Sequence, residues 1–187
     1  MDPNKTLYVA TRGEWRAWLL EHYRTEEEIW LIYYRKDSGQ PRIPYSDAVK
    51  EALCFGWIDS NTHGIDDERY AQKFSRRKST SPYSQANKER LKILLEEGLV
   101  MEGVLASLGD VDPENYEFPD DIMEALKNNQ AAWKNFQSYS PPYQRIRVAF
   151  IDSARKRPET FEKRLNHFLK MTEQDKQFGF GIEEFFK

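Results

Sequence analysis

The sequence has little of what disulfides, metal sites and membrane spans are made from. Cys54 is the single cysteine, which excludes an internal disulfide and a cysteine-based zinc site. The three histidines, His22, His63 and His167, are too scattered to suggest a metal cluster. No run comes near the roughly 20 apolar residues that a membrane-spanning helix needs. We therefore expect no metal, no other cofactor and no membrane span.

A secretion signal is also missing. Residues 1–15 lack a basic segment followed by an apolar one, so we expect a cytoplasmic protein. The chain does have 39% hydrophobic and 14% aromatic residues for a core, and 32% charged residues for a solvated surface. Its 187 residues fit one domain, or one domain with a helical appendage, since domains usually run to roughly 100–200 residues.

The charged residues are segregated, although the formal net charge is only −3. Between 72 and 88 every charged residue is basic, a composition that suits phosphate or another anion. Between 110 and 124 every charged residue is acidic, which is typical of a solvated connector but would also attract a cationic peptide. The basic residues are Lys73, Arg76, Arg77, Lys78 and Lys88, and the acidic ones are Asp110, Asp112, Glu114, Glu117, Asp120, Asp121 and Glu124.

The first half of the chain alternates between strand and helix patterns. Residues 29–34 are all apolar, which predicts a central strand covered on both faces. Ser46 is expected to cap a helix that Gly56 ends, and Gly64 is expected in the loop of the hairpin that follows. These patterns predict an α+β unit, a small antiparallel sheet with flanking helices. We expect strands at 7–11, 27–36, 57–61 and 69–75, and helices at 13–23 and after Ser46.

The second half predicts helices only. Ser84 and Ser140 are plausible caps, and prolines stand where first helical turns tolerate them. We expect helices at 85–97, 101–108, 122–127, 143–156 and 159–172, and a division of the chain into an α+β domain at 1–112 and a helical module at 113–187. In the helix at 143–156, the expected inward stripe is Ile146, Ala149, Phe150 and Ser153, with Arg145, Arg147, Arg155 and Lys156 outside.

Five apolar residues lie in the terminal stretch 178–187, namely Phe178, Phe180, Ile182, Phe185 and Phe186. An apolar patch of this size is seldom left bare. The tail is therefore expected either to fold back on the body or to dock on a protein partner.

A set of motifs runs through most of the chain in a recognisable order. The run EALCFGWIDS (51–60) precedes DxxRYxxKFSRRKS, which ends at Ser79, and YSQANKERLKILLEEGLVMEGV follows at 83–104. The distal part contains PDDIMEAL (119–126), FxxYSPPY (136–143) and FIDSARKRPET (150–160). Together these motifs resemble the YdeI/OmpD-associated family. The sequence departs from that family at Tyr83, where tryptophan is usual, and at Ser75-Arg76-Arg77, where a PRR element is common.

The resemblance implies a stress protein that protects against bacteriocins or antimicrobial peptides, with a link by name to an outer-membrane porin. It implies no settled biochemical activity. We therefore expect a non-enzymatic binding protein.

The hairpin at 57–75 with its basic extension is the candidate site. Along strand 57–61, side chains alternate, so Trp57 and Asp59 share a face, and Asp59 is expected near Gln72 or Lys73. Aromatic walls with a few converging polar groups suit a small ligand or a stacked base. In this interpretation Trp57, Tyr70 and Phe74 are stacking surfaces, Asp59 and Ser60 orient the ligand, Arg76, Arg77 and Lys78 clamp an anion, and Tyr83, Ser84 and Asn87 contribute from the next helix.

Three other interpretations stay open. In the first, the aromatic residues are core, Asp59 accepts backbone hydrogen bonds, and the basic side chains are only solvated. In the second, the basic stretch binds single-stranded nucleic acid, although the pI of about 5.7 argues against a dedicated nucleic-acid binder. In the third, Cys54, His63 and Asp59 act as nucleophile, base and orienting group of a hydrolase or transferase.

Overall fold

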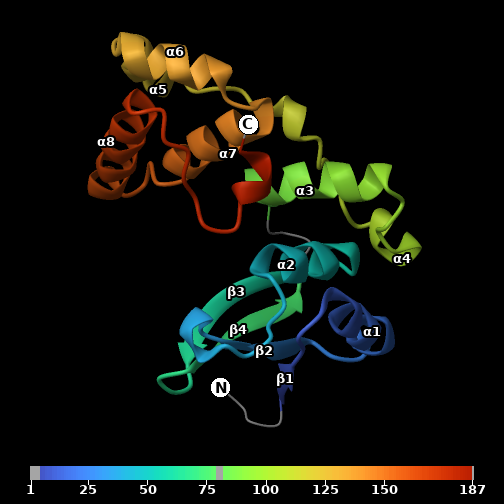
Figure 1. Ribbon diagram of the computed structural model, residues 1–187. Helices are drawn as coiled ribbons and strands as arrows, with labels where there is room; N and C mark the ends of the chain where they lie inside the picture. The colour runs from blue at the N-terminus through green and yellow to red at the C-terminus, as the bar shows by residue number, and fades with distance from the viewer. Residues whose placement is uncertain (1–4, 79–81, 187) are drawn as a thin grey trace. The chain divides into compact units, whose positions relative to one another are not determined.

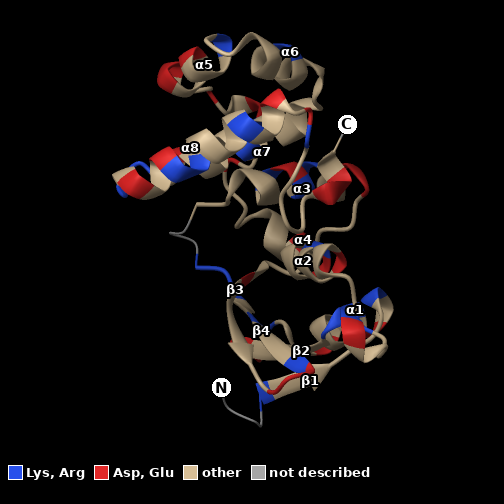
Figure 2. Ribbon diagram, turned by 60° about the vertical axis from the view of Figure 1, so that its left-hand side comes forward, with Lys and Arg blue, Asp and Glu red and all other residues tan. Residues whose placement is uncertain are grey.

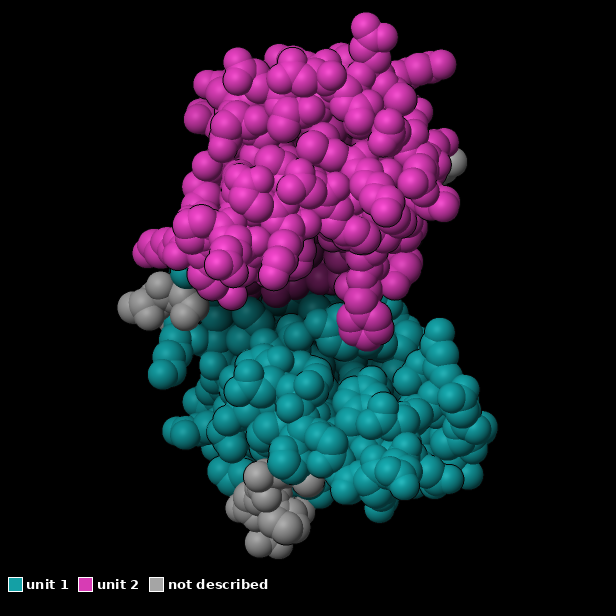
Figure 3. All heavy atoms as spheres, turned by 90° about the vertical axis from the view of Figure 1, so that its left-hand side faces the viewer, with its two compact units in different colours: residues 1–82, 93–110 teal, residues 83–92, 111–187 magenta. Residues whose placement is uncertain are grey.

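The computed structural model describes residues 5–78 and 82–186. Contacts divide the chain into two compact units, which Figure 3 colours separately. Unit 1 comprises residues 1–82 and 93–110, and unit 2 comprises residues 83–92 and 111–187. The expected α+β first part and all-helical later part are confirmed. Within the described residues, no helix has both the length and the apolar character required to cross a membrane.

Unit 1 is built on a four-stranded sheet in the order β1-β2-β4-β3 (Figure 1). Its strands are β1 (Thr6–Tyr8), β2 (Glu28–Tyr34), β3 (Trp57–Gly64) and β4 (Arg69–Arg76). β1 is parallel to β2, whereas β2 with β4 and β4 with β3 are antiparallel. The expected antiparallel sheet is therefore corrected in one pairing. Helix α1 (Arg12–His22) follows β1 and returns the chain to the same end of the sheet, as a parallel pair requires.

Two helices of unit 1, α1 and α2 (Tyr45–Cys54), cover one face of the sheet (Figure 1). The indole nitrogen of Trp15 on α1 donates to the carbonyl oxygen of Ala48 on α2 at 3.0 Å, and the Trp15 ring contacts Phe74 of β4. Along β2, burial alternates residue by residue, with Leu31 fully buried and its neighbours partly exposed. The prediction that β2 is covered on both faces is wrong, because both helices pack on the same face.

Local signals in unit 1 set the helix ends. Thr11 and Glu14 form a reciprocal capping box at the start of α1. The expected cap Ser46 lies inside α2 instead, because that helix begins one residue earlier, after Pro44. Gly56 follows α2 with φ of 71°, a left-handed conformation that favours glycine, so its role as the helix stop is confirmed.

The hairpin of β3 and β4 forms as expected, with one irregularity. Trp57 pairs with Arg76 and Asp59 pairs with Phe74, but the register shifts between Asp59 and Thr62. This bulge lengthens the strand, so that Gly64 pairs with Tyr70 as the last residue of β3 and does not lie in the loop.

Unit 2 is helical, and its caps follow the sequence. Ser84 Oγ accepts from the amide of Asn87 at 3.3 Å, and Ser140 Oγ accepts from the amide of Tyr143 at 3.2 Å. The helix capped by Asn129 is absent from the expected set. The helices of the later part are α3 (Gln85–Glu96), α4 (Glu102–Leu105), α5 (Asp120–Lys127), α6 (Gln130–Ser138), α7 (Pro141–Asp152) and α8 (Pro158–Glu173). Of these, α3 starts in unit 2 and ends in unit 1, and α4 belongs to unit 1. Short 3-10 turns lie at Lys36–Ser38, Pro113–Asn115 and Glu183–Phe185.

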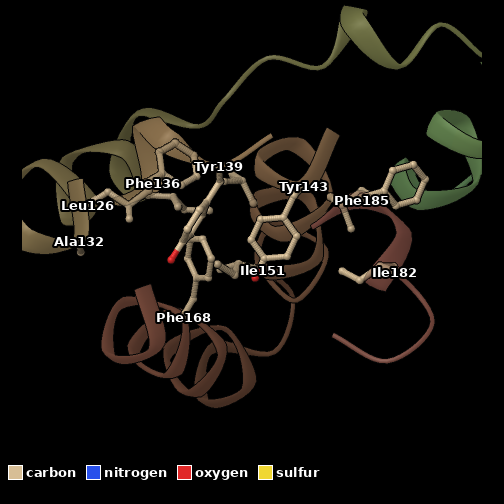
Figure 4. Close-up of a cluster of buried hydrophobic side chains, with 12 residues drawn as sticks. Leu126, Ala132, Phe136, Tyr139, Tyr143, Ile151, Phe168, Ile182 and Phe185 are labelled. Atoms are coloured by element: carbon tan, nitrogen blue, oxygen red, sulfur yellow. The ribbon is translucent and has the colours of Figure 1, made fainter. Parts of the chain in front are cut away.

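The core of unit 2 is rich in aromatic rings. Figure 4 shows Phe136, Tyr139, Tyr143 and Phe168 directed toward one another from α6, its end, α7 and α8. The terminal stretch adds Ile182 and Phe185 to this cluster, each 7% exposed. Of the two expectations for the tail, folding back is therefore the one observed, although Phe180 remains 78% exposed.

The inward stripe predicted for α7 is confirmed at Ile146 and wrong at Phe150 and Ser153. Phe150 is 44% exposed, whereas Arg147, which was expected outside, is only 6% exposed. The residues that α7 buries are Tyr143, Ile146, Arg147, Val148 and Ile151. Apolar side chains populate both candidate faces of this helix, so periodicity alone could not select the buried one.

Candidate anion-binding pocket

A pocket of about 440 Å³ lies within unit 1, near the C-terminal ends of α1, α2 and β4 and beside α4. The segment after α1 contributes Tyr23 and Arg24, the segment after α2 contributes Phe55 and Gly56, and the end of β4 contributes Arg76 and Arg77. The remaining lining residues, from α4 and the turn after it, are Gly103, Val104 and Ser107.

Aromatic rings form the apolar part of the wall. Tyr23 and Phe55 meet edge to face at a centroid distance of 5.2 Å. The guanidinium of Arg24 stacks over the Tyr23 ring at 5.2 Å, and its Nε donates to the Tyr23 hydroxyl at 2.8 Å. This wall offers the uncharged part of an organic ligand a surface to pack against.

The end of β4 holds the two adjacent arginines in place. Arg76 Nε donates to the carbonyl oxygen of Glu26 at 2.7 Å, and the backbone amide of Arg77 donates to the carbonyl oxygen of Gly56 at 2.9 Å. Figure 2 shows the chain at the end of β4 as a run of basic residues. Because the Arg77 amide is hydrogen-bonded to Gly56, both arginines stay beside the aromatic wall of the pocket.

The charge of the lining is wholly positive, since it contains Arg24, Arg76 and Arg77 and no acidic side chain. Guanidinium groups are planar forks that bind carboxylate or phosphate through paired hydrogen bonds. Ser107 also belongs to the lining, and its hydroxyl group donates to the carbonyl oxygen of Val104 at 2.7 Å. The pocket is therefore suited chemically to an anion that carries an apolar part.

Two glycines belong to the lining of the pocket. A Cβ would make ordinary van der Waals contacts at both positions, at 3.4 Å from Val104 Cγ1 for Gly56 and at 3.6 Å from Arg24 Nη2 for Gly103. Gly56 has the positive φ described above, so a larger residue there would strain the backbone.

The residues predicted from the hairpin are partly brought together and partly separated. Arg76 and Arg77 line the pocket, whereas Lys78 is exposed outside the lining. Trp57 and Phe74 have no exposed surface and belong to the core between the sheet and the helices. Tyr70 is partly buried and stacks on Tyr33 at 5.2 Å.

Asp59 makes the contacts expected of it on the sheet. Its Oδ2 accepts from the Tyr45 hydroxyl at 2.7 Å and from Gln72 Nε2 at 3.4 Å, so its predicted proximity to Gln72 is confirmed. Ser60 is exposed, and its carbonyl oxygen accepts from the same Gln72 amide at 2.9 Å. Neither residue lines the pocket.

The three predicted residues at and just before the start of α3 belong to unit 2. Tyr83 is 8% exposed, Ser84 caps α3, and Asn87 Oδ1 accepts from Arg90 Nη1 at 3.0 Å. These are contacts of structural side chains within unit 2. Their assignment to a ligand site stays a prediction.

The lining residues that the sequence did not predict are Tyr23, Arg24, Phe55, Gly56, Gly103, Val104 and Ser107. They come from segments far apart in the sequence, and none of them stands in a motif with the basic stretch. The one available signal was a basic residue, Arg24, directly after a helix.

The enzyme interpretation required Cys54, His63 and Asp59 to meet. Cys54 is fully buried on α2, His63 is exposed near the end of β3, and Asp59 is hydrogen-bonded to Tyr45. Burial, followed by the charge of Glu51, raises the pKa of the Cys54 thiol to about 11. A buried thiol of this kind is a small apolar core residue rather than a nucleophile.

Cys54 is expected to be nearly inert toward thiol reagents in the folded protein. Only the thiolate reacts, so a pKa raised to about 11 leaves about 100-fold less thiolate at pH 8 than in the unfolded chain. A chromogenic thiol reagent added to native and to urea-unfolded protein measures both rates. Similar rates in the two states would show that Cys54 is accessible and would contradict its burial.

The acidic stretch expected to attract cations is already partly occupied by internal contacts. Asp121 receives two hydrogen bonds from Arg155, at 2.7 and 2.9 Å, and Glu114 pairs with Lys92. Asp112 Oδ1 accepts from the amide of Glu114 at 2.9 Å. Less free negative charge therefore remains for a cationic peptide than the sequence suggests.

Two family models match the chain. Residues 115–175 match the model described as Bacteriocin-protection, YdeI or OmpD-Associated. Residues 7–107 match the model described as Domain of unknown function (DUF8412). No curated protein and no solved structure matches this chain. The second range contains the whole lining of the pocket.

Proposed function

We infer the function of this chain from two facts: it belongs to the YdeI/OmpD-associated, bacteriocin-protection family, with DUF8412 as its first domain, and three arginines line a pocket in that domain. We propose that it is a non-enzymatic binding protein whose DUF8412 domain takes up a small organic anion in this pocket. The proposal assigns ligand binding to unit 1, whereas the bacteriocin-protection match lies in unit 2.

The observation that carries the proposal is the charge of the lining. Arg24, Arg76 and Arg77 surround a space of about 440 Å³ without an acidic side chain among the lining residues. Cations gathered around one space repel one another, and a bound anion relieves this repulsion. The Tyr23 and Phe55 rings favour a ligand with an apolar or aromatic part beside its phosphate or carboxylate.

The decisive experiment is a thermal-shift screen with nucleotides, sugar phosphates and aromatic carboxylates, in parallel on the native chain and on the double variant Arg76→Gln and Arg77→Gln. A ligand at 100 times its dissociation constant should stabilise the native chain by about 2.7 kcal/mol. We expect the double variant to lose this stabilisation, because both substitutions remove a charge that lines the pocket.

Lys36→Gln is the matched control, since it removes one positive charge from an exposed residue of the same unit. Lys36 follows the end of β2 that pairs with Arg69, whereas Arg76 lies beyond the other end of the same pairing, and these two ends are roughly 20 Å apart at about 3.3 Å per residue. The proposal fails if the double variant keeps the shift, or if Lys36→Gln loses it equally.

Salt separates this proposal from the nucleic-acid interpretation. A single-stranded oligonucleotide contacts many cations at once, and its affinity therefore falls steeply between low and moderate salt. A small anion in the pocket depends on two or three arginines and should respond far less. Including an oligonucleotide in the screen, at two salt concentrations, makes this comparison directly.

A further inference from the structure

Arg147 of α7 is a buried cation in unit 2, and the part of the chain that the structure describes offers it no carboxylate partner. The residue is only 6% exposed, and its Nε is buried without a hydrogen-bond partner. Among the described residues, no carboxylate forms an ion pair with it. Its guanidinium lies over the Phe178 ring at 4.0 Å, with the Phe150 and Phe168 rings at 5.2 and 5.8 Å.

Such an arrangement is unfavourable as it stands. A buried charge normally requires a counter-charge and hydrogen bonds to offset the water it has lost. Arginine does not lose this charge by releasing its proton, because its pKa remains far above neutral pH in proteins. Aromatic faces attract a cation, but they do not satisfy the N–H donors of the guanidinium.

A second arginine lies close by, which increases the imbalance. The guanidinium of Arg164 on α8 lies 3.7 Å from the centre of the Phe150 ring, which Arg147 also contacts. Its Nη1 donates to the carbonyl oxygen of Phe150 at 2.6 Å and to Ser153 Oγ at 3.1 Å, both uncharged acceptors. Burial and the charge of Arg164 lower the pKa of Arg147, and burial and the charge of Arg157 lower the pKa of Arg164.

The tail brings its backbone close to this cation. Gly179 has φ of 142°, and a Cβ there would lie 3.4 Å from Arg147 Nη1 and 2.5 Å from Ile182 Cδ1. Glycine therefore allows the tail to pass beside the guanidinium. The amide of Phe178 donates to the Tyr143 hydroxyl at 3.0 Å, which fixes the ring of Phe178 over Arg147.

We propose that Arg147 and Arg164, framed by the Phe150 and Phe178 rings, form a second oxyanion site that binds a carboxylate or phosphate group. The site lies in the unit matched by the bacteriocin-protection model and is separate from the arginine pocket of unit 1. The bound oxyanion accepts hydrogen bonds from the guanidinium groups and supplies the counter-charge that no carboxylate of the described residues provides. This site goes beyond the proposed function, which concerns unit 1 only.

The test uses the full chain carrying Arg76→Gln and Arg77→Gln, so that the pocket of unit 1 does not contribute. Thermal shifts are measured with inorganic phosphate and with acetate, each against sodium chloride of equal ionic strength. We expect phosphate, acetate or both to stabilise this parent beyond chloride, and the two anions separate a phosphate site from a carboxylate site. Adding Arg147→Met should raise the apparent dissociation constant about tenfold or more, the usual effect of losing a hydrogen bond to a charged group.

Arg147→Met should also raise the melting temperature in the absence of the anion, because methionine fills a similar volume without a buried charge. Arg164→Gln is the second variant, and it removes a partly exposed cation whose loss does not threaten the core. Lys163→Gln is the matched control, because it removes one exposed charge at the neighbouring position of α8 and should leave binding unchanged.

Two results would overturn the site. One is a parent that neither phosphate nor acetate stabilises beyond chloride. The other is an anion effect that persists in both Arg147→Met and Arg164→Gln, or that Lys163→Gln removes to the same extent.

Discussion

Trp57→Ala is expected to lower the free energy of unfolding of unit 1 by about 3–5 kcal/mol, the usual loss for a fully buried aromatic side chain. The Trp57 side chain has no exposed surface and meets Trp18 edge to face at 5.8 Å. Its indole nitrogen donates to the carbonyl oxygen of Tyr23 at 3.3 Å. Alanine leaves a cavity and a buried carbonyl group without its donor, and both raise the free energy of the folded state.

Urea unfolding of the two proteins measures this loss. Trp30→Ala is the control, because Trp30 lies on the same sheet but on the face that α1 and α2 leave uncovered, and it is only partly buried. We expect it to lose clearly less stability than Trp57→Ala. Equal losses would mean that Trp57 is not the core residue described above, and would return it to the set of surface residues available to a ligand.

The double variant Arg12→Gln and Arg16→Gln is expected to lose about 3–5 kcal/mol, the range found when a buried ion pair keeps only one of its charges. Glu51 of α2 is 1% exposed, and both arginines of α1 bind it, Arg16 Nη1 at 2.7 Å. With both guanidinium groups gone, the carboxylate stays buried without a counter-charge. Each single substitution should cost less, since one arginine remains.

A third substitution provides the control for this prediction. Adding Glu51→Gln to the double variant removes the uncompensated charge, so part of the lost stability should return. The measurement is again urea unfolding. A further loss on adding Glu51→Gln would show that the carboxylate contributes through other contacts than these two ion pairs.

Much of the fold follows from local signals in the sequence. The Ser84 and Ser140 caps and Gly56 act over a few residues, so each was recognised without knowing the rest of the chain. Thr11, which caps α1, was instead assigned to the expected strand 7–11. The hairpin of β3 and β4 and most helices were predicted for this reason. α6 was missed because its cap, Asn129, follows another asparagine directly after α5 and no gap separates the two patterns.

The candidate site was predictable only in its basic part. Arg76 and Arg77 stand next to each other and could be recognised as an anion clamp, and both line the pocket. Arg24, Gly103 and Ser107 join them through the packing of the segments after α1 and around α4, which no spacing in the sequence encodes. The aromatic residues Trp57 and Phe74 were placed beside the ligand because strand alternation shows that two residues share a face, but not which face the helices cover.

By itself, the sequence determined the α+β and all-helical halves, most element ends and the family resemblance, because each depends on residue types at short spacing. Tertiary structure alone decided that β1 pairs parallel to β2, that α1 and α2 cover the same face, and that α7 buries Arg147 instead of Phe150. These features depend on contacts between residues distant in the sequence, where several packings satisfy the same periodic pattern. Both arginine clusters proposed as anion sites arise at this level, since long-range packing collects their cations from separate segments of the chain.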